Sequence, residues 1–259
     1  MAVLLTFDVE QDLHSSNYKS LEFGIPKLLS LLNKHNIKAT FFVPAKLIKN
    51  FPDLFISLGS QGHEIALHGY EHERFDDLTY FEKENRIKKS LTIYTKIFKK
   101  LPKGFRTPQH SIDEETLKIL NKHKFSYDSS YTPFNILQLF FFPKKFKLWL
   151  KGFFSPRDKY KLMENFYEIP TSSFLIPFVS LPLRIFPWLF LKIYLAVLKF
   201  TNKNLVFYAH SWDFIDIPKS RIDNLFSNRK LYKNLDKTIT YLNKDNKFLR
   251  VQELLNEKN

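Results

Sequence analysis

The stretch Glu64-Ile65-Ala66-Leu67-His68-Gly69-Tyr70-Glu71-His72 is the most informative part of this chain. Residues 64–67 form a strand candidate that leads into His68 and a glycine. His68 and His72 stand at positions i and i+4, so one helical turn would place both imidazoles on one face. Two imidazoles and a carboxylate are a common ligand set for a metal ion that keeps one position for water. The stretch therefore indicates a metal-assisted hydrolase.

Strand and helix candidates alternate on both sides of this stretch. The predicted strands are 3–7, 38–43, 64–67, 104–106, 125–129, 166–170, 205–208 and 248–251. The predicted helices are 21–35, 45–58, 79–99, 113–123 and 225–242. Such alternation predicts parallel βαβ units in an α/β fold, and about seven or eight units in one domain favour a closed barrel over an open sheet.

Length and composition limit the domain count and the ligand chemistry. A chain of 259 residues can bury one large core, and no glycine/serine linker divides it, so we expect a single domain over residues 1–259. There is no cysteine, so any metal must be held by His, Asp or Glu. The first residues carry no basic leader and no long apolar run, which predicts no signal peptide and a cytoplasmic protein.

The net charge of +14 suggests an anionic partner, although a solvated lysine-rich surface explains it equally well. No nucleic-acid-binding motif accompanies the charge, so we expect no nucleic acid partner. Two aromatic and basic segments, 134–157 and 174–200, interrupt the strand–helix rhythm. Prolines and cations within 174–200 argue against a membrane-spanning helix. The segments are either elaborations of the barrel or a surface that rests on anionic lipid at the inner membrane face.

Polar residues follow several predicted strands, and the carboxyl ends of barrel strands share one face, where active sites lie. Asp8 and Glu10 are two residues apart on a strand, so their side chains point the same way, and either one could bind a metal while the other acts as a base. Asp12 is a rival for either role. Arg106 needs a carboxylate partner in its apolar context, and Asp8 is the obvious candidate. His210 also falls at a strand end.

The remaining histidines have other expected positions. His110 follows the fourth strand and is expected only to line the pocket. The other histidines, at positions 14, 35, 63 and 123, are expected on the surface or at helix ends.

Six segments together resemble the polysaccharide deacetylase (NodB-homology, carbohydrate esterase family four) superfamily, whose members remove N-acetyl groups from sugars. The segments are Thr6-Phe-Asp-Val-Glu10, His68-Gly-Tyr-Glu-His72, Phe105-Arg-Thr-Pro108, Tyr127-Asp-Ser-Ser130, Glu168-Ile-Pro170 and Phe207-Tyr-Ala-His210-Ser-Trp212. They follow the family's order and span nearly the whole chain. The resemblance implies a distorted barrel of about seven β/α units with a divalent metal, usually Zn²⁺.

The resemblance also implies roles for individual residues. Asp8 is similar to the general base, and Arg106 to the residue that orients it. His68 and His72 are similar to metal ligands. His210 is similar to the general acid. The remaining implied residues are Asp128, as a carboxylate that orients His210 or binds substrate, and Pro108, Pro170 and Trp212, which would shape the substrate pocket.

The first motif departs from the commonest family pattern, in which two aspartates are adjacent. Here Val9 separates Asp8 from Glu10, which resembles an Asp-Val-Glu branch that includes capsule- and exopolysaccharide-associated members. We therefore expect Glu10 as the third metal ligand in preference to Asp12.

The expected function is removal of N-acetyl groups from a polysaccharide, an oligosaccharide or a lipid-linked glycan. One alternative is a related hydrolase of carbon–nitrogen bonds in a small amide or cyclic ureide. Another, of a different class, is a membrane- or glycan-binding protein without catalysis. The sequence leaves the sugar and the oligomeric state open.

Overall fold

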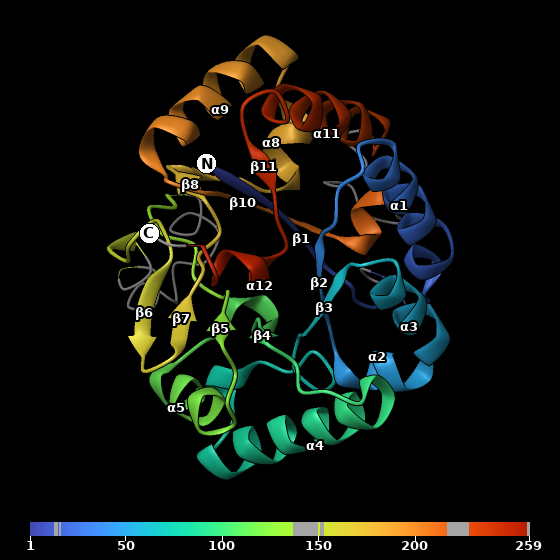
Figure 1. Cartoon of the computed structure of the whole chain (residues 1–259), viewed down its shortest axis with the longest axis vertical. Coiled ribbons are helices and arrows are strands. Elements are labelled where there is room, and N and C mark those ends of the chain that lie inside the picture. Colours follow the sequence, from blue (N-terminus) through green and yellow to red (C-terminus); the bar gives the residue numbers. More distant parts are fainter. Residues whose placement is uncertain (13–14, 16, 137–149, 151–152, 217–227, 258–259) are drawn as a thin grey trace.

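The computed structural model describes residues 1–12, 15, 17–136, 150, 153–216 and 228–257. Within these residues, nine strands form one curled sheet in the order β10-β1-β2-β3-β4-β5-β7-β6, with β11 paired to β1. Helices surround this sheet on its outer side (Figure 1). The predicted distorted β/α barrel in a single α/β domain is confirmed.

The strands that build the barrel are short and mostly parallel. The parallel strands are β1 Ala2–Asp8, β2 Thr40–Val43, β3 Glu64–Leu67, β4 Gly104–Phe105, β5 Tyr127–Asp128, β7 Phe166–Glu168, β10 Leu205–His210 and β11 Lys247–Phe248. Strand β6 (Tyr160–Met163) pairs antiparallel with β7. The hairpin strands β8 (Ser173–Phe174) and β9 (Ile176–Pro177) form a separate small sheet.

Except for the last one, the helices pack on the outside of the sheet and lie between the strands in sequence. They are α1 Ile25–Lys34, α2 Ala45–Asn50, α3 Pro52–Ser60, α4 Tyr80–Phe98, α5 Glu114–Lys122, α8 Ser180–Ile185, α9 Trp188–Thr201, α11 Asn228–Leu242 and α12 Val251–Leu254. Helix α4 starts at a capping box in which Thr79 and Glu82 satisfy each other's backbone N–H groups. No helix within the described residues is both long and apolar enough to cross a membrane.

Side chains alternate between two cores along the strands. On β1, Val3, Leu5 and Phe7 pack against the helices in the large outer core. Leu4 points the other way and joins a smaller core inside the barrel, which Val251 and Leu254 of α12 also enter. Because Thr6 and Asp8 follow Leu4 at intervals of two, they also face the barrel interior.

The barrel closes between β7 and β10 without a regular strand ladder. The Ser172 N–H donates to the carbonyl of Val206, and the Tyr208 N–H donates to the carbonyl of Phe178. The segment after β7 therefore occupies the position of a missing strand, which explains the distortion of the barrel.

Some predicted boundaries were wrong. The helix predicted over 45–58 is two helices, because the chain turns at Phe51 and restarts at Pro52. The strand predicted over 248–251 ends at Phe248, and Val251 begins α12. His63, expected near the surface, is 3% exposed. In the elaboration predicted over 134–157, residues 137–149 and 151–152 lie outside the described residues, whereas 174–200 forms β8, β9, α8 and α9.

Candidate metal centre and active site

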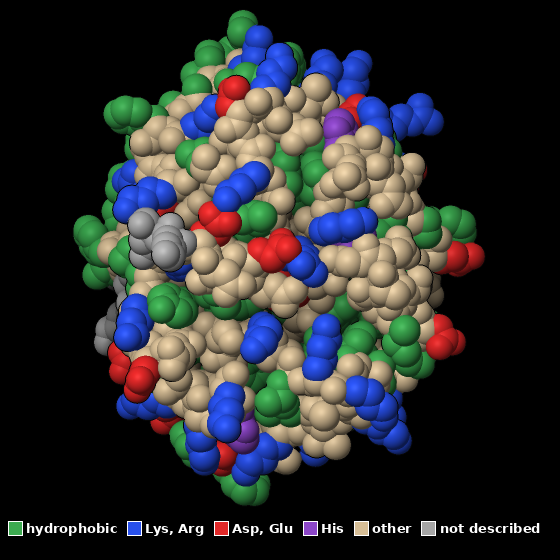
Figure 2. Space-filling model, viewed as in Figure 1, with side chains coloured by type: hydrophobic (Ala, Val, Ile, Leu, Met, Phe, Trp, Pro, Cys, Tyr) green, Lys and Arg blue, Asp and Glu red, His purple; other side chains and the backbone are tan. Residues whose placement is uncertain are grey.

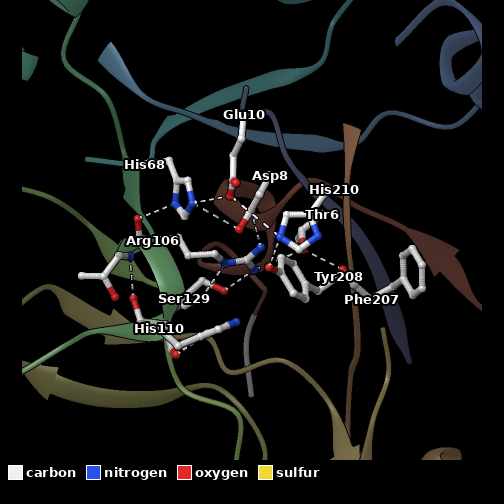
Figure 3. A network of polar contacts seen from close by, with 12 residues as sticks. Thr6, Asp8, Glu10, His68, Arg106, His110, Ser129, Phe207, Tyr208 and His210 are labelled. Atoms are coloured by element: carbon white, nitrogen blue, oxygen red, sulfur yellow. Dashed lines mark hydrogen bonds and ion pairs between the residues drawn. The ribbon is translucent and has the colours of Figure 1, made fainter. Parts of the chain in front are cut away.

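Five predicted site residues come together where the barrel strands end (Figure 3), and these are Asp8, Glu10, His68, Arg106 and His210. Asp8 is the last residue of β1 and lies beside His210, the last residue of the neighbouring strand β10. His68 directly follows β3, and Arg106 directly follows β4. The parallel register therefore gathers four segments that are far apart in sequence at one end of the barrel.

Glu10 and the two histidines of the 64–72 stretch form a cluster suited to a metal ion. The Oε1 atom of Glu10 lies 3.1 Å from Nε2 of His68 and 3.0 Å from Nε2 of His72. One ligand atom from each of these residues lies within 4.8 Å of the others. Two imidazole nitrogens and a carboxylate oxygen are the donors that catalytic Zn²⁺ sites use.

Asp12 does not join this cluster. Its two carboxylate oxygens accept hydrogen bonds from the backbone N–H groups of Lys19 and Ser20, at 2.7 and 3.0 Å. Asp12 thus satisfies free donors at the start of the helical turn Ser20–Gly24.

The backbone holds the two histidines in place. Nδ1 of His68 lies 2.8 Å from the carbonyl oxygen of Arg106 and donates to it, which leaves the Nε2 lone pair facing Glu10. His72 has a positive φ of 75° and follows Gly69, whose φ is 72°. A Cβ atom on Gly69 would lie 3.1 Å from the Pro108 ring, so the turn has little room for a side chain. Pro108 thus packs behind the turn that carries His72.

The carboxylates and imidazoles of this cluster shift one another's pKa values. Burial raises the pKa of Glu10, but the charge of His210 and hydrogen bonds from His68 and His72 outweigh this effect and bring the pKa well below its ordinary value. Burial lowers the pKa of His68, yet the nearby carboxylates of Asp8 and Glu10 raise it overall. Acidic and basic groups thus face one another around a common point, where a divalent cation would take the place of the proton.

Arg106 forms the buried ion pair with Asp8 that the sequence suggested. Its NH1 atom donates to Oδ1 of Asp8 at 2.8 Å. Its other donors bond to the Ser129 carbonyl, the Ser129 hydroxyl and the Thr6 hydroxyl. Arg106 is fully buried, and these partners offset the free energy that burial of its positive charge costs. They also fix one oxygen of Asp8 and leave Oδ2 directed toward His68, 3.5 Å from Nε2.

His210 stands on the other side of the cluster, with Nε2 at 3.8 Å from Glu10. Its ring stacks on Trp212 with centroids 4.0 Å apart, and the buried Nε1 of Trp212 has no partner among the described residues. The Tyr208 hydroxyl lies 2.6 Å from Nε2 of His210. Trp212 and Tyr208 therefore form the walls around this imidazole.

The carboxylate that accompanies His210 is Asp213, which the sequence analysis did not identify. Its Oδ2 atom lies 3.7 Å from Nδ1 of His210 and accepts the His210 backbone N–H at 2.8 Å. Arg184 donates to its Oδ1 at 2.7 Å. Burial opposes ionisation, but His210 and then Arg184 lower the Asp213 pKa overall. Hydrogen bonding and charge from Asp213 outweigh the effect of burial on His210 and raise its pKa.

Asp128 has a different environment from the one expected for an orienting partner of His210. Its oxygens accept from the backbone and hydroxyl of Ser130, and it pairs across the sheet with Glu168. Burial raises the pKa of Asp128 to about 6 and that of Glu168 well above its ordinary value. The sequence does contain a feature that could have identified Asp213 as the partner of His210, because an acidic residue stands three positions after that histidine.

His110 lies beside the site and stays neutral. Its Nδ1 atom lies 2.7 Å from the Ser130 carbonyl, and its ring packs edge-on to Tyr208. Burial and the charge of Arg106 lower its pKa to about 4.

A pocket of about 380 Å³ opens next to the metal cluster. Its lining residues are Glu10, Gln11, Asp12, Ser15, Tyr18, Pro44, Lys46, Leu47, Asn50, Glu71 and His72. The predicted substrate-binding residues Pro108, Asp128 and Trp212 do not line it. Most of its wall comes from the segments after β1 and β2, where only Glu10 and Asp12 were expected to bind a ligand.

Residues 1–127 match the sequence profile of the polysaccharide deacetylase family. A peptidoglycan deacetylase of Helicobacter pylori is 33% identical over 120 residues, which cover 44% of this chain and 41% of that protein. The chain thus spans less than half the length of this relative.

Solved structures with the same fold cover almost the whole chain. A candidate polysaccharide deacetylase from Mycobacterium smegmatis superposes with a TM-score of 0.72 and 18% identity, covering 98% of this chain and 88% of that one. An allantoinase superposes with a TM-score of 0.70 and 15% identity, covering 98% of this chain and 89% of that one. At such low identity these two likenesses show the fold alone. The matched profile and the related sequences thus show that the first half of the chain is similar to the polysaccharide deacetylase family, and the solved structures show that the whole chain shares this fold.

Proposed function

We propose that the chain is a metal-dependent hydrolase that removes N-acetyl groups from an N-acetylated glycan. The observation that carries the proposal is the arrangement around Glu10: two imidazoles beside its carboxylate, Asp8 with one free oxygen next to them, and His210 across from them. This set combines a group of metal ligands, a base and an acid at one end of the barrel, beside the pocket.

Glu10, His68 and His72 would hold the metal, and their donor set best suits Zn²⁺. A bound Zn²⁺ would supply Lewis-acid polarisation of the acetamide carbonyl and would lower the pKa of a water molecule. The hydrogen bond from Nδ1 of His68 to the Arg106 carbonyl supports this role, because it directs Nε2 inward.

Asp8 is the proposed general base. Arg106 occupies its Oδ1 atom, so Oδ2 remains to accept the proton of the attacking water. Arg106 cannot rotate away, because the hydroxyl groups of Thr6 and Ser129 and the Ser129 carbonyl hold its remaining donors.

His210 is the proposed general acid, which protonates the leaving amine of the sugar. Its raised pKa favours the imidazolium form, and Asp213 stabilises that positive charge. Stacking on Trp212 fixes the plane of the ring. The products are acetate and a free amino sugar.

The pocket beside the cluster supports a glycan substrate. Tyr18 offers a ring and Asn50 and Glu71 offer polar groups within it, which is the combination that sugar rings bind. The Helicobacter pylori relative is named for peptidoglycan, so we propose an N-acetylglucosamine-containing glycan for this chain.

Acetate release tests this proposal. The wild-type protein, loaded with Zn²⁺, is incubated with N-acetylglucosamine oligomers and with peptidoglycan fragments. We expect release by the wild type and a loss of at least about 100-fold in kcat for Asp8→Asn, because general base catalysis contributes that much or more. Asp245→Asn is the control, since Asp245 is exposed and far from the site in sequence.

Allantoin serves as the competing substrate in the same assay. Activity that survives Asp8→Asn would contradict the assignment of the base. Turnover of allantoin in place of the glycans would replace the proposed substrate by a cyclic ureide and would keep the site.

A further inference from the structure

Helix α9 presents an apolar surface to solvent. Its inward residues, Leu191, Leu195 and Leu198, pack in the core. Its outward residues are apolar as well: Phe200 is 91% exposed, Leu189 63%, Phe190 59% and Ile193 56%. Together with exposed Ala196, these four side chains recur at intervals that place them on one side of an α-helix. We name them the α9 outer face.

Positive charge borders this face on the side of the neighbouring helix α11. Lys199 of α9 lies over the Tyr241 ring at 5.8 Å, and Lys237 of α11 lies over the Trp188 ring at 5.7 Å. Trp188 and Tyr241 also contact each other edge-on, with centroids 6.2 Å apart. In Figure 2, hydrophobic side chains and Lys or Arg side chains lie together along the upper edge of the molecule, where Figure 1 places α9 and α11.

Negative charge is missing from the whole segment that carries the face. Residues 169–212 contain no Asp or Glu but contain Arg184, Lys192, Lys199 and Lys203. Arg184 is neutralised by Asp213, and the three lysines remain on the surface. A second copy of this chain would bring the same positive charge, so the charge pattern favours an anionic occupant over self-association.

We propose that the α9 outer face docks the protein on an anionic membrane surface. Exposed Phe, Leu and Ile would enter the boundary between headgroups and acyl chains, while Lys192, Lys199 and Lys237 would contact lipid phosphates. Trp188 and Tyr241 would lie at headgroup depth, which these side chains prefer. The helix has 14 residues and is therefore about 21 Å long, less than the roughly 30 Å of a bilayer core, so it lies along the interface.

Vesicle flotation at low salt tests the proposal. The probe is a vesicle of phosphatidylcholine mixed with phosphatidylglycerol, compared with phosphatidylcholine alone. We expect the full chain to float with the anionic vesicles, and each lysine charge removed by Lys192→Gln or Lys199→Gln to weaken binding about fivefold. Added salt should weaken binding as well, because it screens these charges. The control pair is Lys49→Gln and Lys100→Gln, which are exposed in α2 and just after α4, two helices that lie far from α9 in Figure 1.

The apolar contribution needs its own variants. Phe190→Ser and Phe200→Ser should each reduce binding by about tenfold, because each removes a large side chain from the lipid boundary. Phe81→Ser is the matched control, since Phe81 is 77% exposed but lies on α4. Circular dichroism confirms that each variant folds.

Three outcomes would overturn the proposal: no flotation of the wild type with anionic vesicles, unchanged flotation of the Phe190 and Phe200 variants, or a dimer in sedimentation that these variants abolish without any vesicle binding. The last outcome would assign the face to a second copy. The flotation assay needs no catalysis, so its failure leaves the deacetylase proposal untouched, and loss of acetate release leaves this one untouched.

Discussion

Arg106 and Asp8 form an ion pair in which neither side chain reaches solvent. A buried ion pair stabilises little by itself, because desolvation of both charges offsets their attraction. Its effect here is geometric, since three further hydrogen-bond acceptors fix the guanidinium plane and so fix Asp8. The pair therefore sets the position of the proposed base before substrate binds.

The same logic applies to His210, the proposed acid, which Asp213 and Arg184 hold. We expect Asp213→Asn to lower kcat by about 100-fold or more with little change in KM, because the imidazolium of the proposed acid loses its counter-charge. Steady-state acetate release measures both constants. Asp236→Asn, which changes a surface partner of Lys34, is the control. An unchanged kcat would show that Asp213 only supports the fold.

Single residues were predicted unevenly. The convergence of the carboxylates, the histidines and Arg106 on one site could be predicted from the sequence, because a barrel brings the carboxyl ends of its strands together. The preference for Glu10 over Asp12 rested on the family resemblance and not on the pattern of residues at strand ends, because the pattern does not show that the backbone N–H groups of residues 19 and 20 bind Asp12. Asp213 was missed because a carboxylate inside a short helical turn resembles an ordinary cap.

At the scale of elements, β4 and β5 meet where no side chain fits. A Cβ atom on Gly104 would lie 1.9 Å from the Tyr127 ring, which is buried in the barrel and donates its hydroxyl to Glu64 at 2.9 Å. The two-residue strand β4 therefore depends on a glycine for its approach to β5.

Gly104→Ala should lower the free energy of unfolding by about 2 kcal/mol or more, because the Tyr127 ring must leave its position in a packed core. Gly59→Ala is the matched control. Gly59 lies in α3 with nothing within 4 Å of its would-be Cβ, so alanine there should stabilise by roughly 0.5–1 kcal/mol. Urea unfolding of both variants checks the pair. Equal stabilities for the two would contradict the close packing of β4 on β5.

Elements with strong local signals were predicted well. Strand 64–67 and helix 79–99 were close to the observed bounds, because the first is bounded by glycines and the second begins at a capping box. The antiparallel strand β6 and the hairpin β8–β9 were missed, since their pairing depends on neighbours distant in sequence and not on a local pattern. Tertiary packing also decided the break at Phe51.

At the scale of the whole molecule, α12 covers the amino-terminal mouth of the barrel, opposite the site. Its first N–H groups donate to Thr40 Oγ1 and Glu64 Oε2 inside the barrel, and Leu254 packs into the inner core. The last helix of the described chain is thereby linked to the first three strands. The barrel fold was predictable from the alternation of strands and helices, but the position of α12 at the mouth of the barrel was not.

His63 makes the stability of this unit sensitive to acid. Its Nδ1 accepts the Ala39 N–H, and burial with the charges of Lys38 and Arg250 lowers its pKa from 6.5 to about 4. Between these two values the unfolded chain binds a proton and the folded chain does not, so acidification favours unfolding by roughly 1 kcal/mol per pH unit. Above pH 6.5 the effect vanishes.

Urea unfolding across this pH range tests the effect in the wild type and in His63→Asn, whose amide oxygen can still accept the Ala39 N–H. We expect a shallower loss of stability in the variant. A decline as steep as that of the wild type would assign the acid sensitivity to other groups, of which His110 is the first candidate.

The central claim is that Glu10 joins His68 and His72 in one metal centre, and the metal content of the purified protein tests it most directly. Bound metal is removed with a chelator, the protein is dialysed against Zn²⁺ and then against metal-free buffer, and its zinc content is measured by inductively coupled plasma mass spectrometry. We predict about one Zn²⁺ per chain for the wild type and for Asp12→Asn, and a loss of most bound Zn²⁺ for Glu10→Gln. A wild type that retains no Zn²⁺, or a Glu10→Gln variant that retains as much as the wild type, would contradict the claim.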